Sequence, residues 1–445
     1  MKLSEEHIFK GYWWLPMNPN NKVAGILTFT PGERMCLELI GGFENAHGEY
    51  IGLFDENNKI PLIYGKDSNA KEITLVDCYS SFTLNFSAEF PIMRYSARLL
   101  VFDKHLNSLD ERCEYTAYIR FPELSQWAPP GAIEQIVSFD QEGKEIKSST
   151  VVLPFLNGND GVIFSTRCEN GVQVSIFKGV SYNSWKLSLK PYLEQYSYLE
   201  IKRPGIGMSL PEVFHELYKF QQFLSLATRR NVQPESIYLN DPNIRQDFKE
   251  GQKSFYFPIY ILAIQRHVYN PTELNRDKFL FRYEDIPDRI SDILAKWMSD
   301  SDNLRPIKNH LVDSLVYKPL VGSVDFLQVI QAIEGVWWRF RDDEYRAVNI
   351  ISKQKRTTLT TILQEILKTF SDVPKVSSMN LDIEAVVDSR NYYSHFVDKS
   401  KKSKTLDGIQ LYDLTRQLRT ILLCLVLELL SLTHTEINML LSKQK

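Results

Sequence analysis

Two residues with complementary chemistry stand five positions apart in residues 390–395, which read RNYYSH. The guanidinium of Arg390 can hold and neutralise a phosphate, and the imidazole of His395 can move a proton near neutral pH. RNA carries its own nucleophile, the ribose 2′-hydroxyl, so its cleavage by such a pair needs neither a metal nor a covalent enzyme intermediate. The pair therefore predicts metal-independent RNA cleavage, provided that the spacing is no coincidence.

The same spacing occurs a second time, at Arg305 and His310, so the spacing alone carries little information. Pro306 directly follows Arg305, which favours the start of a helix and a structural role for that copy. The copy at residue 390 lies inside a helical pattern, where Arg390 shares an apolar stripe with residues such as Val386. An unpaired guanidinium in such a stripe is costly, so Arg390 requires an acceptor.

A second, polar stripe on the same predicted helix carries Glu384, Asp388, Asn391 and His395. Asp388 or Asn391 could orient the imidazole or the RNA, although a polar stripe can also be plain solvated surface. Residues five apart lie about 140° from each other on an ideal helix. We therefore expect Arg390 and His395 to be halves of a site that a second copy of the chain completes.

Four more residues are candidates for a supporting role. Glu334, beside the apolar stripe of an upstream helix, could pair with Arg390 or could be an exposed carboxylate. Lys399, Lys401 and Lys402 follow the motif and could track an RNA backbone, or they could belong to a solvated loop.

The 445-residue chain is 43% hydrophobic and 24% charged, which is ordinary globular composition with room for two or three domains. Residues 1–205 are net acidic and the remainder is slightly basic, so an RNA partner fits the second part better. Five scattered cysteines without a CxxC predict a reducing compartment, no disulfides and no zinc site.

Other sequence features narrow the function classes. P-loop, GxSxG and HExxH motifs are lacking, so we expect no metal, no cofactor and no nucleotide hydrolysis. The longest apolar run, residues 421–432, contains Glu428 and is too short to span a bilayer. It predicts a buried packing helix. With no signal-peptide pattern in the first residues, we expect a cytoplasmic protein without a membrane partner.

The predicted fold is α+β and multidomain. A β-rich, sandwich or barrel-like domain covers residues 1–205, a mixed region covers 206–320, and a helical domain covers 321–445. Pro204 and two glycines mark the first boundary, and Ser209 can cap the helix after it. The turn 169–171 predicts a hairpin. The expected strands are 25–30, 35–40, 73–76, 98–102, 115–121, 150–155, 162–166, 172–177, 196–201, 255–264 and 278–283.

Six further helices are expected after the one that Ser209 can cap, and they position the candidate residues. Glu334 falls on the third of them, and the Arg390 motif falls on the fifth. The expected ranges are 285–299, 308–316, 324–341, 357–370, 381–397 and 411–432.

Three stretches resemble the ApeA-type anti-phage proteins of the HEPN superfamily of helical ribonucleases. Residues 390–395 match the motif of Arg, a polar residue, three free positions and His, with Asn391 as the polar residue. Residues 325–334 are similar to the first core helix of that HEPN domain. Residues 11–16, which read GYWWLP, are similar to the opening of the ApeA N-terminal domain. The three matches occur in both halves of the chain.

The resemblance implies a homodimeric endoribonuclease of abortive infection, with the two motif helices facing each other across a shared cleft. His395 would be the general base or acid, Arg390 would stabilise the phosphorane-like charge, and Asn391 would position the imidazole or the RNA. Some HEPN toxins carry a modifiable Tyr where this chain has Val397. Control by the chain's own N-terminal domain, released by a phage-derived trigger, is therefore expected in place of a modifying partner.

The alternative belongs to a different class of protein. The helical half would be a non-catalytic dimerisation or RNA-binding module, and the β domain would bind a phage component. This alternative predicts that replacing His395 leaves the function intact.

Overall fold

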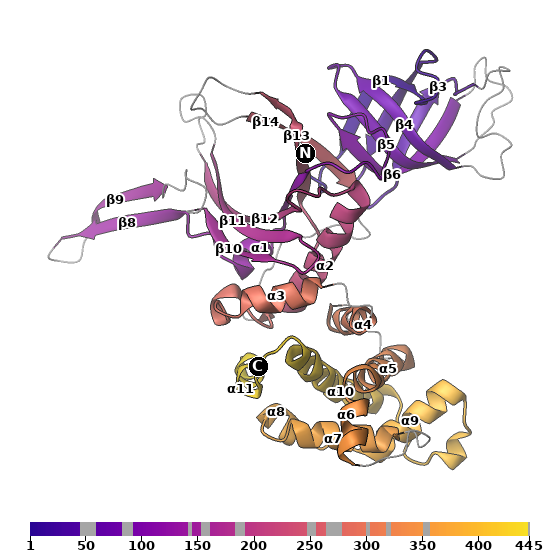
Figure 1. The fold of residues 1–445 in the computed structure, drawn as a ribbon, viewed down its shortest axis with the longest axis vertical. Helices are drawn as coiled ribbons and strands as arrows, with labels where there is room; N and C mark the ends of the chain where they lie inside the picture. Colours follow the sequence, from indigo (N-terminus) through magenta and orange to yellow (C-terminus); the bar gives the residue numbers. More distant parts are fainter. Residues whose placement is uncertain are drawn as a thin grey trace. The chain divides into compact units, whose positions relative to one another are not determined.

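The computed structural model describes most of the chain (Figure 1). The chain folds into two compact units. Unit 1 comprises residues 1–217 and 233–274, and unit 2 comprises residues 218–232 and 275–445. Residues of the predicted mixed region 206–320 thus occur in both units. The described residues are 1–44, 59–81, 92–140, 145–152, 161–182, 192–246, 255–263, 278–299, 303–316, 322–349 and 357–443.

Unit 1 begins with a closed, antiparallel six-stranded barrel (Figure 1), which confirms the β-rich, barrel-like N-terminal fold. The strands follow one another in the order β6-β3-β2-β1-β4-β5, and pairing of β5 with β6 closes the ring. Side chains alternate between the interior and the surface, as β2 illustrates. The strands are β1 (His7–Trp14), β2 (Val23–Phe29), β3 (Met35–Ile40), β4 (Lys59–Asp67), β5 (Glu72–Ser81) and β6 (Ile92–Phe102).

Two glycines of the barrel, Gly65 and Gly11, allow close approaches between β1 and β4. The ring of Trp13 is fully buried and lies against Gly65, its register partner on β4. A Cβ atom on Gly65 would lie 2.4 Å from two ring carbons of Trp13, and one on Gly11 would lie 2.1 Å from the carbonyl oxygen of Lys66. Only glycine fits these close approaches. Trp13, Trp14 and Leu15 of the GYWWLP opening are therefore core residues, whereas Tyr12 is exposed.

A second antiparallel sheet continues from the barrel in the order β10-β11-β12-β7-β13-β14, and β14 pairs with the end of β6. The 169–171 turn prediction is confirmed, because Gly171 has a φ of +80° in the β10–β11 hairpin. The elements are β7 (Thr116–Arg120), α1 (Leu124–Trp127), β10 (Val162–Arg167), β11 (Gln173–Tyr182), β12 (Leu193–Lys202), β13 (Ser236–Gln246) and β14 (Phe255–Ala263), beside a separate ribbon of β8 (Ile133–Phe139) and β9 (Glu145–Val152).

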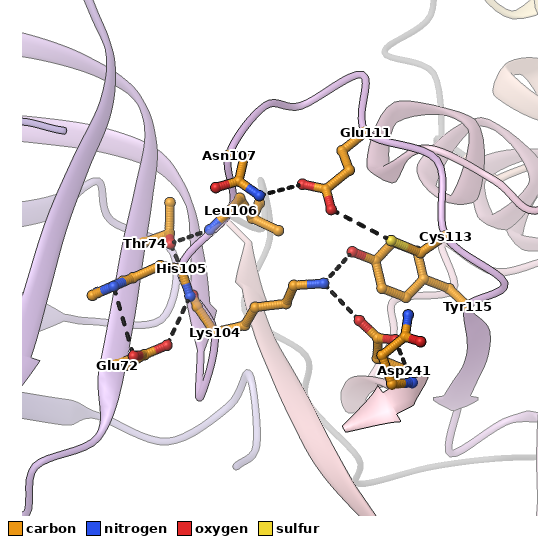
Figure 2. A network of polar contacts seen from close by, with 11 residues as sticks. Glu72, Thr74, Lys104, His105, Leu106, Asn107, Glu111, Cys113, Tyr115 and Asp241 are labelled. Carbon is orange, nitrogen blue, oxygen red and sulfur yellow. Dashed lines mark hydrogen bonds and ion pairs between the residues drawn. The ribbon is translucent and has the colours of Figure 1, made fainter. Parts of the chain in front are cut away.

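A polar network fastens the barrel to this sheet (Figure 2). The Lys104 ammonium, just beyond β6, donates to Asp241 Oδ2 at 2.6 Å and to the Tyr115 hydroxyl at 3.0 Å. Burial disfavours the charged ammonium, but the hydrogen bonds to Asp241 and Tyr115 outweigh burial and raise the pKa of Lys104. Thr74 of β5 accepts from the backbone of Leu106 and donates to that of Lys104, which holds the loop in place.

The sheet-to-helix transition lies where Pro204 and the glycines predict it. Strand β12 ends at Lys202, and α2 (Leu210–Thr228) contributes residues to both units. Ser209 caps α2 as predicted, because its backbone amide donates to Glu212 Oε2 at 2.9 Å and its Oγ accepts from the Glu212 amide.

Unit 2 is helical, as predicted (Figure 1). Helix α5 (Ser323–Phe340) packs against α4 (Arg305–Val316), α9 (Ile383–His395) and α10 (Gly408–Leu429). Phe326, Ile330 and Ile333 of α5 are buried in this core. The other helices of the unit are α3 (Ile290–Met298), α6 (Asp342–Val348), α7 (Leu359–Thr369), α8 (Pro374–Ser377) and α11 (His434–Ser442), with 3₁₀ turns at η2 (Tyr283–Asp285) and η3 (Lys399–Lys401).

One strand prediction in unit 2 is wrong. Residues 278–283 form no strand. The amides of Leu280 and Phe281 donate instead to the carbonyl oxygen of Ala227 near the end of α2. Phe279, Leu280 and Phe281 are all buried, so this apolar run fills the helical core without joining a ladder.

The predicted strands 150–155 and 255–264 are described only in part: β9 reaches Val152 and β14 reaches Ala263, and the remaining residues lie outside the described ranges. Most of the apolar run 421–432 is a packing helix, since Ile421 to Leu427 are buried in α10, which ends at Leu429. None of the described helices is long and apolar enough to cross a membrane.

Candidate active site

Helix α9 carries the three motif residues, and both of its ends are fixed locally. The Asp382 side chain caps the N-terminus by accepting from the Ala385 amide at 3.0 Å. Ala385, Val386 and Ser389 form the buried face. The helix ends at His395, because the next residue adopts the left-handed conformation.

Arg390 lies at the edge of that face and has three acceptors. Its Nη1 atom donates to His395 Nε2 at 2.9 Å and to Asn391 Oδ1 at 3.2 Å. Its Nη2 atom donates to Glu334 Oε1 at 3.3 Å. The side chain is 26% exposed, so the guanidinium is paired but open to solvent on one side. This meets the requirement for an acceptor.

Arg390 and His395 converge within one chain, although their separation on an ideal helix did not require it. The expectation that a second copy of the chain completes the site stays a prediction. The 140° separation applies to the directions in which side chains leave an ideal helix. The long arginine side chain spans that angle, and His395 stands on the last helical residue, with no further turn between the two groups. A guanidinium can only donate, so the contact requires a neutral imidazole with its lone pair on Nε2.

Glu334 adopts the first of the two alternatives considered for it: it pairs with Arg390. It stands on α5 beside the buried stripe of that helix, and its side chain is 17% exposed. The residue lies 56 positions before Arg390 in sequence, and packing of α5 against α9 brings the two together. The carboxylate thus places a negative charge at the guanidinium.

Asp388 is not directed at the imidazole. Its carboxylate accepts from Lys402 Nζ at 3.2 Å and from the Lys404 amide at 3.3 Å. Asn391 likewise contacts Arg390 and not His395 in the described structure. The polar stripe therefore divides: Asn391 belongs to the arginine cluster, and Asp388 holds the segment that follows α9.

The lysines after the motif are mostly engaged within the chain, which favours the structural alternative for them. Lys399 pairs with Asp407 at 2.9 Å, and Lys402 pairs with Asp388. Lys401 is exposed, and among the described residues it has no ion pair.

Sequence reasoning assigned no role to three residues of this region. Buried Ser389 accepts from the Leu406 amide through its Oγ atom at 3.0 Å, and the Tyr393 hydroxyl donates to the Leu406 carbonyl oxygen at 3.1 Å. Burial, followed by the charge of Asp407, raises the pKa of Tyr393. A serine on an apolar face was the available signal for Ser389. The third is Phe396, a bulky residue directly after the motif.

The second copy of the spacing forms no comparable cluster. Helix α4 begins at Arg305, as Pro306 predicts. In the described structure, His310 and Arg305 make no hydrogen bond to each other. Within the same described ranges, no group of three or more His, Cys, Asp or Glu residues could hold a metal ion.

Comparison with known families covers both parts of the chain. The model of ApeA N-terminal domain 1 matches residues 8–297, and the model of the Apea-like HEPN domain matches residues 327–436. The second match contains Glu334, Arg390, Asn391 and His395. No curated protein and no solved structure matches the chain.

Proposed function

This chain belongs to the ApeA-type HEPN family, a class of anti-phage proteins, and on that premise we propose that it is a metal-independent endoribonuclease. The observation that supports the proposal most directly is the 2.9 Å contact between Arg390 and His395. It joins a phosphate-binding group and a proton-transfer group at a solvent-accessible helix end.

In the proposed reaction, His395 is the general base. Its Nε2 lone pair takes the proton of a ribose 2′-hydroxyl once Arg390 turns from the imidazole to the adjacent phosphate. The 2′-oxygen attacks phosphorus, and the bond to the 5′-oxygen breaks as that oxygen receives a proton. The products are a 2′,3′-cyclic phosphate and a 5′-hydroxyl.

Arg390 stabilises the charge that develops on the phosphorane-like state. Glu334 and Asn391 support this role, because their oxygens hold the guanidinium beside His395 before RNA arrives. The two residues act through Arg390 and are therefore positioning residues. Arg390 keeps enough exposure for a phosphate to reach it.

The active form is proposed to be a cytoplasmic homodimer. The exposed end of α9 would face the same end of a second copy, whose imidazole, in its protonated form, would donate a proton to the leaving 5′-oxygen while His395 keeps the proton of the 2′-hydroxyl. The N-terminal β domain would restrain the enzyme until a phage-derived component releases it, since an unrestrained ribonuclease would damage its own host. Net acidic charge in residues 1–205 is compatible with masking of a basic RNA site.

The test compares His395→Ala and Arg390→Ala with His310→Ala in the full chain. We expect the first two to lose about 10²- to 10⁴-fold in RNA cleavage, the usual contribution of a positioned acid–base group. They should also abolish protection against phage, while His310→Ala retains both. RNA integrity in infected cells and circular dichroism of the purified variants provide the measurements.

Full protection by His395→Ala would contradict the catalytic proposal. In combination with loss of protection when the β domain is disrupted, that result would favour the non-catalytic binding module.

A further inference from the structure

We infer that Phe396 is a stacking surface for an unpaired RNA base beside the scissile phosphate. This inference rests on the proposed ribonuclease function and extends it to the form of the substrate. Phe396 directly follows His395, and 90% of its surface is exposed. Among the exposed large apolar side chains of the described residues, Phe396 has the largest exposed fraction, and it adjoins the proposed base.

The backbone at Phe396 points to a function for the ring. Its φ of 52° and ψ of 36° are left-handed, a conformation that glycine and asparagine tolerate and that a bulky residue rarely adopts. The exposed ring contributes little packing, and the left-handed backbone, although it ends α9, is costly for phenylalanine. Unfavourable features of this kind persist at sites where a ligand compensates for them.

The neighbouring aromatic rings are already committed to packing. Tyr393 donates its hydroxyl to Leu406 and meets Phe326 edge-on, with ring centroids 6.4 Å apart. Tyr392 meets Tyr393 edge-on at 4.8 Å. Phe396 has no such ring contact within the described part of the chain. It is therefore the aromatic side chain of this segment whose face is open to a ligand.

The surroundings favour a nucleic acid over an apolar protein surface as the occupant. Lys401 is exposed nearby in sequence, and the partly exposed Arg390 belongs to the same site. The nearby carboxylate of Asp398 is held locally by the Ser400 amide at 2.8 Å. An apolar partner would have to desolvate these charges, whereas RNA offers phosphates to them and a flat base to the ring.

The geometry also predicts a preference for single-stranded RNA. The nucleotide whose 2′-hydroxyl meets His395 carries its base on the same ribose, so that base or its neighbour is within reach of the next residue. A base in a duplex is already stacked on both faces and cannot cover Phe396 without leaving the helix. Loops and single strands should therefore be cut in preference to duplexes.

The experiment is a double-mutant cycle that removes the Phe396 ring, the RNA base, or both. The full chain and Phe396→Ala are each given a single-stranded RNA with one cleavage site and the same RNA with an abasic nucleotide at either side of it. We expect the abasic change and Phe396→Ala each to lower kcat/KM roughly 10- to 100-fold, the effect of losing one base–aromatic stack. Phe396→Ala acting on the abasic RNA should lower kcat/KM no further than either change alone.

Three further variants separate stacking from bulk and surface effects. Phe396→Trp should retain activity and Phe396→Leu should behave like Phe396→Ala, because leucine keeps apolar volume without a π face. Tyr182→Ala removes another exposed aromatic, at the end of β11 in unit 1, and should leave cleavage unchanged.

The inference would be overturned if the losses of kcat/KM from the abasic change and from Phe396→Ala multiplied. Full activity of Phe396→Leu would also overturn it. So would a shift of Phe396→Ala from dimer to monomer in sedimentation, since the ring would then belong to an interface between copies. If the wild type cleaves no RNA, the proposed function fails by itself. The same cycle, measured as binding of a strand with a 2′-deoxy cleavage site, then still decides whether Phe396 stacks on a base.

Discussion

Two clusters in this chain combine a cation, a carboxylate and a ring, yet their surroundings differ. In unit 1, Lys104 is 13% exposed and Asp241 is 2% exposed, and their charged atoms lie 2.6 Å apart. In unit 2, the Arg390–Glu334 distance is 3.3 Å and both side chains are more exposed. The first pair is closed off from solvent by the barrel and the second sheet that it joins.

The two cations also differ in how their hydrogen-bond donors are used. Lys104 directs its ammonium at Asp241 and at the Tyr115 hydroxyl, both of which belong to the fold (Figure 2). Arg390 shares two nitrogens among three acceptors, and its Nε atom has no hydrogen bond among the described residues. A buried pair with matched partners serves stability, whereas a partly exposed guanidinium with a spare donor can exchange a partner for a phosphate.

The largest effect should come from breaking the buried pair. Asp241→Ala leaves the Lys104 ammonium without its carboxylate, and removing one partner of a buried pair costs about 3–5 kcal/mol. Hydrogen exchange measured on peptides from β6 and β13 in the full chain should show a matching loss of protection.

The matched control replaces both charges, as Lys104→Met with Asp241→Leu. Because an apolar pair removes the desolvation cost together with the attraction, this variant should be near wild type in stability or above it. Wild-type protection in Asp241→Ala would show that the pair does not fasten the barrel to the sheet.

The partly exposed pair should respond in the opposite way. Glu334→Ala is expected to change stability by less than about 1 kcal/mol, as for other solvent-accessible ion pairs. Cleavage should nevertheless fall roughly tenfold, because Arg390 is no longer held beside His395. Glu334→Gln keeps an oxygen acceptor and should recover most of kcat/KM. If the glutamine variant were as slow as the alanine variant, the carboxylate charge itself would be required.

Local patterns in the sequence predicted much of this fold. Short apolar runs predicted most strands of the barrel and the second sheet but missed β1, β4 and β13. Helical periodicity placed α5, α9 and α10 within a few residues of their bounds. Pairing between segments that are distant in sequence was harder to predict. The sequence does not indicate that β6 pairs with both β3 and β14. Nor does it indicate that the amides of Leu280 and Phe281 donate to a carbonyl oxygen near the end of a helix.

The candidate site shows the same limit at the scale of side chains. Residue types and family resemblance identified Arg390, Asn391 and His395, but an ideal-helix angle did not predict the contact between Arg390 and His395. That angle omits side-chain length and the helix end. The sequence could name Glu334 only as a candidate partner of Arg390, because tertiary packing decides which helices lie against each other. For Asp388, a role toward the imidazole or the RNA was one alternative. Helical periodicity does not reveal its partners, because Lys402 and Lys404 lie on an irregular segment.

The smallest expected effect distinguishes two lysines of the segment that follows α9. Lys401 is exposed without an ion pair in the described chain, whereas Lys402 is engaged by Asp388. If Lys401 contacts a phosphate, Lys401→Ala should lower the slope of log binding constant against log salt by about 0.7, the value for one contact with a single strand. Binding of a 2′-deoxy-substituted strand between about 50 and 200 mM salt measures this slope. Lys402→Ala should leave the slope nearly unchanged, because its charge is already neutralised within the chain. Equal changes in both variants would mean that the ion pair with Asp388 opens when RNA binds, and that the contrast between committed and available charges fails at this loop.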